Sequence, residues 1–376
     1  MPPSSQRPRR SSSAGSARPR ASSRRLAHAK ALEPNAFAAL LSTVQDETEA
    51  RLSACLDSRL ERAEKIAPEV GTMVSALSEL CLRGGKRLRP ALLVAGYRAA
   101  SARADLDIAL DAGVALELLQ AYFLIHDDWM DGDIVRRGGP SVHALLGERF
   151  QNQRLGDASA ILAGDYAVAL ATELLAELDV RSGVQARVFA CFARMQLAAV
   201  AGQQIDLVAE AGDIELAYAL KTGSYTVQGP LELGALLASG STVTLRALER
   251  FARPLGIAFQ LRDDLLGAFG DPSKTGKPLG NDLRAGKRTL LLAAALERAR
   301  PADRVLLGRV VGNRKARDKD LRAALEILEK SGARAAVEAR IAQLSRRALK
   351  AIGRDVTVEG RELLTGAVEL LAQRRT

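Results

Sequence analysis

The chain has 376 residues and a mass of 40.1 kDa, and 47% of its residues are hydrophobic, which is enough for one large core or two ordinary ones. Its formal net charge is +10, but residues 1–30 contain eight basic side chains and no acidic one, so the rest of the chain carries only +2 of that excess. This distribution argues against a nucleic-acid-binding protein, and an aromatic content of 4% with few β-branched runs argues against a mostly β fold.

The N-terminal segment, residues 1–32, is rich in Ser, Arg and Pro and poor in apolar residues, so it lacks the burial that would offset its ordering entropy. We therefore expect a disordered basic tail. The same composition also describes an organelle transit peptide, and that alternative stays open. Cys55, Cys81 and Cys191 have neither metal-ligand spacing nor the even number of a disulfide framework, which favours a reducing, cytoplasmic setting.

From residue 33 to residue 376 the composition shows no break and no fixed repeat, and we therefore predict one domain, 33–376. Apolar residues recur three and four positions apart in segments 46–65, 105–128, 158–178, 184–209 and 245–266, which predicts helices there. Charged residues such as Asp165, Glu173 and Glu297 interrupt or end the longest apolar stretches. We therefore expect an all-α protein with no stable membrane insertion.

The first candidate site lies in the run ELLQAYFLIHDDWMDGDIVRRGG, residues 117–139. On a helix, Asp127 and Asp131 lie on one face, with Asp128 beside them. Carboxylates at a helix C-terminus oppose the macrodipole and repel one another unless a divalent cation neutralises them. Magnesium fits, because it takes one or two carboxylates and completes its shell with water and phosphate oxygens. A solvated acidic helix end is the other interpretation of this spacing alone.

Basic side chains gather near this site and in two further segments. Residues 259–289 combine a pair of aspartates with a Gly-rich stretch, and residues 84–90, GGKRLRP, form a turn that opens a helix, which is a typical anion site. Guanidinium and ammonium groups beside carboxylates predict a diphosphate that metal ions bridge to the protein. The residues concerned are Lys86, Arg87, Arg89, Arg136, Arg137, Asp263, Asp264, Lys274, Lys277 and Lys287.

On these motifs the sequence, from about residue 33 onward, resembles the trans-isoprenyl diphosphate synthase (polyprenyl synthetase) family, above all its short-chain farnesyl and geranylgeranyl members. ELLQAYFL before DDWMD is similar to the eukaryotic farnesyl type, and DDLLGAFGDPSKTGKPLGNDLRAGKRT is similar to bacterial short-chain enzymes. The resemblance implies a single-domain isoprenoid-synthase helical bundle around a deep central cavity, in a homodimer. It implies head-to-tail condensation of isopentenyl diphosphate with dimethylallyl, geranyl or farnesyl diphosphate.

The resemblance also assigns roles to individual residues. Three magnesium ions per active site are implied, with Asp127, Asp131 and Asp263 as metal ligands and with Asp128 and Asp264 supporting them. Gly267 departs from the family pattern, because the second motif has its third aspartate at that position. Lys86, Arg89 and Arg137 would bind the diphosphate of isopentenyl diphosphate; Arg136, Lys221, Lys277 and Lys287 would bind that of the allylic substrate; Thr222 and Gln260 would stabilise the allylic cation; and Gln120 stands beside the substrate where eukaryotic farnesyl types have Gln.

Tyr122 and Phe123 lie five and four residues before Asp127, which is about 6 to 7.5 Å along a helix axis. They are the candidate floor of the pocket that receives the growing chain, although ordinary core aromatics would show the same spacing. In the family, bulk at both positions resembles fifteen-carbon producers. We therefore favour farnesyl diphosphate as the product, with geranylgeranyl diphosphate as the alternative.

Two other classes of protein share parts of this pattern. A class I terpene cyclase also uses DDxxD, but it would carry an Asn/Ser/Glu-type second metal motif and would not need an isopentenyl pocket. The GGKRLRP segment and the pair Asp263 and Asp264 argue against it. A noncatalytic partner subunit would have lost metal or phosphate ligands, and nearly all of them remain here.

Overall fold

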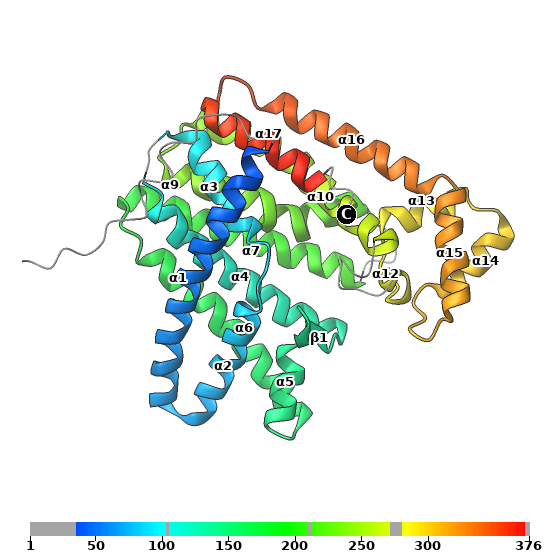
Figure 1. The fold of residues 1–376 in the computed structure, drawn as a ribbon, viewed down its shortest axis with the longest axis horizontal. Coiled ribbons are helices and arrows are strands. Elements are labelled where there is room, and N and C mark those ends of the chain that lie inside the picture. The colour runs from blue at the N-terminus through cyan, green and yellow to red at the C-terminus, as the bar shows by residue number, and fades with distance from the viewer. Residues whose placement is uncertain (1–34, 103–104, 209–211, 271–279, 373–376) are drawn as a thin grey trace, which may run out of the picture.

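The computed structural model describes residues 35–102, 105–208, 212–270 and 280–372, and most of them lie in helices (Figure 1). The first half of the chain contains α1 (Ala36–Ile66), α2 (Pro68–Leu82), α3 (Leu88–Ala100), α4 (Asp107–Asp131), α5 (Val142–Arg149), α6 (Gln153–Ala176) and α7 (Ser182–Val208). The second half contains α8 (Ile214–Tyr218), the π-helix η1 (Ala219–Gln228), α9 (Gly229–Leu237), α10 (Thr242–Phe269), α12 (Asn281–Arg284), α13 (Leu290–Arg298), α14 (Pro301–Val310), α15 (Asp318–Lys330), α16 (Ala333–Ala351) and α17 (Val358–Ala372). Strands within these ranges are confined to an antiparallel hairpin of β1 (Val135–Arg136) and β2 (Gly139–Pro140). The prediction of an all-α fold is confirmed.

Local sequence explains where several helices begin and end. The Asn35 side chain accepts a hydrogen bond from the Ala38 amide at 3.0 Å at the start of α1, and Ser241 accepts one from Thr244 at 3.1 Å at the start of α10. Helix α4 ends at Gly132, whose φ of 65° is the left-handed conformation that glycine adopts easily. This stop leaves Asp127, Asp128 and Asp131 at the C-terminal end of α4.

Helix α4 lies in the interior and packs against α3 and α6. Helix α3 in turn packs closely on α9, because a side chain at Gly96 would collide with the backbone of Leu231, and one at Gly234 would collide with that of Leu93. Helix α10 packs extensively against α16 and η1. The core therefore fixes α4, η1 and α10 relative to one another.

The later helices extend the bundle to one side. Figure 1 shows α12 to α15 gathered at one end of the molecule, with α16 running back along the bundle and α17 returning beside α1. One continuous cluster of buried side chains extends from Phe37 to Ala372. The described elements therefore share a single hydrophobic core.

Among the described helices, α4 and α6 are long and apolar enough to cross a membrane by length and composition. The apolar window of α4 is 72% buried inside the protein, and that of α6 is 39% buried. A core helix of a globular protein passes the same test, and α4 is such a helix. Helix α6 instead leaves Leu155 and Leu162 more than half exposed.

Candidate active site

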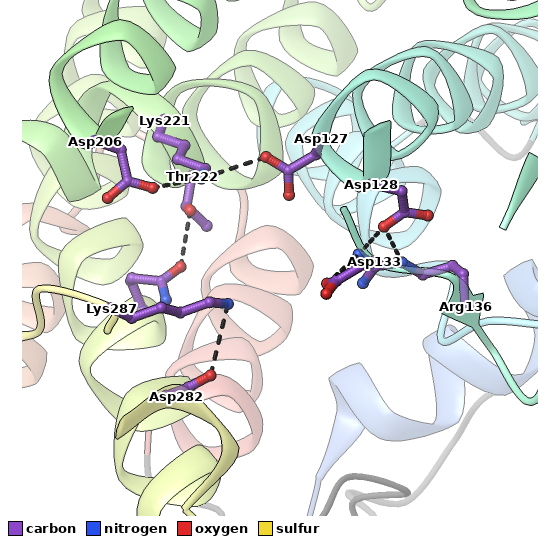
Figure 2. Close-up of polar contacts among 10 residues, drawn as sticks. Asp127, Asp128, Asp133, Arg136, Asp206, Lys221, Thr222, Asp282 and Lys287 are labelled. Carbon is purple, nitrogen blue, oxygen red and sulfur yellow. Dashed lines mark hydrogen bonds and ion pairs between the residues drawn. The ribbon is translucent and has the colours of Figure 1, made fainter. Parts of the chain in front are cut away.

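The first aspartate motif occupies the last turn of α4. Asp127 and Asp131 are partly exposed, whereas the side chain of Asp128 is only 1% exposed and accepts a hydrogen bond from Nε of Arg136 at 2.7 Å. Figure 2 shows the Asp127 carboxylate turned toward Lys221, whose Nζ lies 3.4 Å from Oδ1. The carboxylates of Asp127 and Asp128 thus face different partners although they are adjacent on one helix end.

The surroundings of this helix end disfavour the negative charges of the Asp128 and Asp131 carboxylates. Burial raises the pKa of Asp131, and the neighbouring Asp127 raises it further. Burial also raises the pKa of Asp128, against the opposing effect of Arg136, and its Oδ2 is a buried atom without a hydrogen-bond partner. A divalent cation would relieve the repulsion that this arrangement leaves.

Lys221 and Thr222 project from η1, a wide helical turn of a kind that is frequent at functional sites. Lys221 bridges two helices, because its Nζ lies 2.6 Å from Asp206 of α7 as well as 3.4 Å from Asp127 (Figure 2). Burial opposes the ammonium charge, but the two carboxylates outweigh it and raise the pKa of Lys221. Close packing makes this possible, since a side chain at Gly202 would collide with the Lys221 backbone.

The second aspartate motif lies within α10, before its end at Phe269. Asp263 is exposed, whereas Asp264 is buried and accepts hydrogen bonds from the Tyr218 hydroxyl and from Nε2 of Gln260 at 2.8 Å. Burial raises the pKa of Asp264 to about 7, although both hydrogen bonds oppose the shift. The Thr222 hydroxyl donates to Oε1 of Gln260 at 2.8 Å. This chain of contacts joins η1 to α10.

Lys287 completes this side of the site. Its ammonium lies 3.5 Å from Oδ1 of Asp282, the second residue of the short helix α12. Burial opposes its charge, but Asp282 and the two more distant carboxylates of Asp131 and Asp127 raise its pKa. Lys287 and Lys221 therefore lie in the field of the same carboxylates. Lys277 and Lys274 fall outside the described residues.

The GGKRLRP segment forms a turn with φ angles of 83° at Gly84 and 157° at Gly85. Such angles favour glycine, and a side chain at Gly85 would also come within 3.3 Å of the Arg137 guanidinium. Arg137 and the exposed Lys86 are thus brought to one turn. Burial lowers the pKa of Arg137, which the nearby carboxylate of Glu117 only partly offsets.

Arg89, in the first turn of α3, contacts η1. Its Nη2 donates to the Thr226 hydroxyl at 2.7 Å, and its guanidinium lies 4.5 Å from the centre of the Tyr225 ring. Arg87 behaves differently, because it is only 3% exposed and donates to Glu117 at 2.6 Å and to the Cys81 carbonyl at 2.8 Å. Arg87 therefore stabilises the turn from inside rather than facing a ligand.

The two aromatic residues before Asp127 face different neighbours. The Phe123 ring is 4.7 Å from that of Tyr225, whereas the Tyr122 ring is 4.6 Å from His126, on the side toward α6. The rings of Tyr122 and Phe123 are themselves 4.9 Å apart. Because Phe123 and Asp127 are one helical turn apart, Phe123 shares the face of the first aspartate motif.

Two further residues predicted for the site, Gln120 and Arg136, lie near the first aspartate motif or on the same helix. Gln120 is 8% exposed, and its Oε1 is buried without a hydrogen-bond partner. Arg136 directs its guanidinium to Asp128, so it adjoins the first motif. A cavity of about 720 Å³ lies elsewhere, beside the N-terminal half of α4, where Arg51, Tyr97 and Asp111 line it.

The donor set fits a metal that is shared with a phosphate ligand. Among the described residues, no group of three His, Cys, Asp or Glu side chains could hold an ion by itself. Magnesium often takes only one or two carboxylates from a protein and the rest of its shell from phosphate and water. Asp128 and Asp282 each have a buried oxygen without a hydrogen-bond partner, which is consistent with such a shared site.

Sequence reasoning missed three residues of this site, namely Asp206, Tyr218 and Asp282. Asp206 and Tyr218 come from segments outside the motifs, whereas Asp282 lies within the 259–289 run, where its spacing gave it no role. All three reach the site only through packing. An acidic residue near the end of the mostly apolar α7 was the available signal for Asp206. Nothing in the sequence pattern singled out Tyr218.

An all-helical bundle that brings two aspartate motifs, several lysines and an arginine-lined glycine turn together has the architecture of enzymes that act on prenyl diphosphates. The sequence profile of the polyprenyl synthetase family matches residues 71–328. The chain therefore belongs to the polyprenyl synthetase family.

Relatives and solved structures agree with this assignment. A short chain isoprenyl diphosphate synthase of Methanocaldococcus jannaschii is 33% identical over 280 residues, which cover 71% of this chain and 82% of that protein. A (2E,6E)-farnesyl diphosphate synthase of Mycobacterium tuberculosis is 37% identical over 266 residues, covering 68% of this chain and 70% of that protein. The crystal structure of a geranylgeranyl pyrophosphate synthase of Corynebacterium glutamicum, complexed with isoprenyl diphosphate and magnesium, is 35% identical with a TM-score of 0.81, covering 92% of this chain and 100% of that one.

The protein is thus a prenyltransferase that condenses isopentenyl diphosphate head to tail with allylic diphosphates to give a short-chain all-trans prenyl diphosphate.

Proposed function

We propose that the product is all-trans farnesyl diphosphate and that each active site uses three magnesium ions. The observation that carries the product assignment is the aromatic group formed by Phe123, Tyr122 and Tyr225, with ring centres 4.7 and 4.9 Å apart. Phe123 precedes Asp127 by one helical turn, so a growing chain would contact these rings after only a few added carbons. The farnesyl synthase of M. tuberculosis supports the fifteen-carbon product, and the geranylgeranyl synthase of C. glutamicum supports twenty carbons as the second candidate.

In the proposed site, Asp127, Asp131 and Asp263 hold the metal, while Asp128 and Asp264 support them through Arg136, Tyr218 and Gln260. Magnesium, when bound, neutralises the charge of the leaving diphosphate. The magnesium in the C. glutamicum complex and the carboxylate spacing of this chain support that assignment.

The side chains of the protein act mainly by positioning and by electrostatics. Lys221 and Lys287, with Arg136 and Lys277, bind the allylic diphosphate, so the allylic carbon–oxygen bond ionises toward a stabilised anion. The oxygens of Thr222 and Gln260, joined by a hydrogen bond of 2.8 Å, face the cation that forms.

The second substrate is held by Lys86, Arg89 and Arg137, which place its double bond against that cation, with Gln120 beside it. A new carbon–carbon bond forms and one proton must leave. His126 contacts the Ile161 carbonyl at 3.2 Å on the side toward α6, so we assign the proton to the released diphosphate.

The chain-length proposal is tested by Phe123→Ala. Because Phe123 and Asp127 share a face whereas Tyr122 faces His126, this variant should lengthen the product more than Tyr122→Ala does, and the double variant should lengthen it most. Products are separated by chromatography after incubation with isopentenyl diphosphate and each allylic primer. Phe150→Ala, which removes a partly buried aromatic residue near α5, is the matched control and should leave the product unchanged. A fifteen-carbon product from every variant would refute the aromatic floor.

We also propose a homodimer. Exposed apolar side chains on α6 and α7 support it: Leu162 is 57% exposed, Leu197 72% and Val200 52%. Burying such a surface against a second copy would remove it from water. Sedimentation velocity of the full chain, beside a Leu197→Lys variant, decides between a dimer that the substitution weakens and a monomer in both cases.

A further inference from the structure

The second aspartate motif of this chain lacks its third carboxylate, because Gly267 occupies that position. Gly267 is one helical turn beyond Asp263 in α10, so both positions face the same way. A Cβ built at Gly267 would overlap Oδ2 of Asp282 and lie 3.1 Å from its Cγ and 3.7 Å from its Oδ1. The Asp282 carboxylate thus lies where the side chain of an aspartate at 267 would begin.

We propose that Asp282 supplies the third carboxylate of the second aspartate motif, and that Gly267 is the residue that makes room for it. The proposal rests on the metal site proposed above and adds to it a residue from a different helix. Asp282 and Gly267 act as one functional position divided between α12 and α10.

The local backbone holds Asp282 in this place. Helix α12 is one turn long, with the Arg284 amide donating to the Gly280 carbonyl at 3.2 Å, and the Lys287 amide donates to the Asp282 carbonyl at 2.9 Å. Gly280 has a φ of 65°, which allows the chain to turn into α12. The segment therefore returns to α10 at Gly267 with little freedom to place the carboxylate elsewhere.

The Asp282 carboxylate has unused capacity as a ligand. Its side chain is 15% exposed, and its Oδ1 is a buried atom with no hydrogen-bond partner. The ammonium of Lys287 is 3.5 Å from that oxygen, close enough for attraction but not for a good hydrogen bond. The negative charge of Asp282 also contributes to the raised pKa of Asp264, so it acts on the aspartate pair of α10.

A purely structural role would be that of counter-ion for Lys287. The two roles differ in what a steric change at position 267 does. Gly267→Ala keeps every charge and the Lys287 partner, but its methyl group would displace the Asp282 carboxylate from α10. A counter-ion can move with its lysine, whereas a metal-directed carboxylate cannot.

The experiment measures Mn²⁺ binding to the full chain in the presence of inorganic pyrophosphate, by electron paramagnetic resonance of free Mn²⁺ and by calorimetry. The unmodified chain should bind three ions. Asp282→Asn and Gly267→Ala should each weaken one of them about 10-fold or more, as expected for loss of a carboxylate close to a metal. Asp57→Asn, which removes an exposed carboxylate of α1, is the control and should not change Mn²⁺ binding.

A swap variant tests the division directly. Gly267→Asp together with Asp282→Ala moves the carboxylate back to α10, and its Mn²⁺ affinity should lie within about threefold of that of the unmodified chain. Gly267→Asp alone crowds two carboxylates into one place, and its Mn²⁺ affinity should fall below that range. Circular dichroism and thermal melting verify folding of each variant, and if Asp282→Asn does not fold, Gly267→Ala and the swap variant decide the question. Unchanged Mn²⁺ affinity in Asp282→Asn or in Gly267→Ala would overturn the role of Asp282. Failure of the unmodified chain to bind Mn²⁺ with pyrophosphate would instead overturn the proposed metal site as a whole.

Discussion

The buried ion pair of Arg87 and Glu117 allows a quantitative prediction. The two side chains are 1% and 4% exposed, and their closest atoms are 2.6 Å apart. Glu117→Ala leaves the guanidinium of Arg87 in the interior with only the Cys81 carbonyl at 2.8 Å and the partly exposed Glu49 at 3.4 Å to compensate it. Removing one partner of a buried pair typically costs about 3–5 kcal/mol, and we expect a loss in that range.

The same variant should affect substrate binding. Arg87 has a φ of 45° and immediately precedes α3, so it fixes the turn that presents Lys86 and Arg89. A loosened turn should raise KM for isopentenyl diphosphate more than KM for the allylic substrate. Urea denaturation followed by circular dichroism measures the first effect, and initial rates with either substrate varied measure the second.

Two further variants make the test specific. Arg87→Met with Glu117→Leu replaces the pair by apolar groups and should recover more than half of the lost stability, because no buried charge is left unpaired. Glu326→Gln breaks an exposed pair with Lys330 and should leave the urea midpoint unchanged. If Glu117→Ala is no less stable than the unmodified chain, the buried pair does not hold this turn.

Two other predictions follow from single contacts. Thr226→Val removes the hydroxyl that accepts a hydrogen bond from Arg89 at 2.7 Å. Since hydrogen bonds to charged groups contribute about 1.5–3 kcal/mol, this variant should raise KM for isopentenyl diphosphate about 10-fold. Its KM for the allylic substrate should stay within twofold, and so should both KM values of the control variant Thr172→Val. Asp264, whose pKa burial raises to about 7, binds its proton more tightly in the folded than in the unfolded state, so the metal-free protein should lose stability as pH rises from about 4 to about 7. Asp264→Asn should flatten that dependence in urea titrations with EDTA, and an equally steep profile would exclude Asp264 as its source.

Helix periodicity predicted the all-α class and the five longest of the described helices. The five segments predicted as helices correspond to α1, α4, α6, α7 and α10, and their ends differ by a few residues except that α1 begins ten residues earlier. The π-helical form of η1 was not predictable, because it depends on close packing against other helices. A Cβ at Gly256 of α10, for example, would approach Gly223 of η1 within 2.7 Å.

The candidate site was predictable where its residues are close in sequence. The spacing of Asp127 and Asp131 was sufficient to place them on one helix end. Arg87 shows the limit, because its sequence context is that of a ligand-binding cation, whereas the left-handed backbone turns it toward Glu117. Asp282 was missed for a different reason, since its meeting with Gly267 depends on how α12 returns to α10.

The ten residues of η1 connect the two halves of the proposed reaction. Lys221 and Thr222 at its start face the allylic side through Asp127 and Gln260, while Tyr225 and Thr226 hold Arg89 on the isopentenyl side. A single segment therefore sets the spacing between the side chains proposed to bind the two substrates. Deleting a residue between Thr222 and Tyr225 would change the spacing of the two sides, whereas exchanging Phe123 alters only the space for the tail. Product length can thus vary among such enzymes while the bond-forming geometry stays the same.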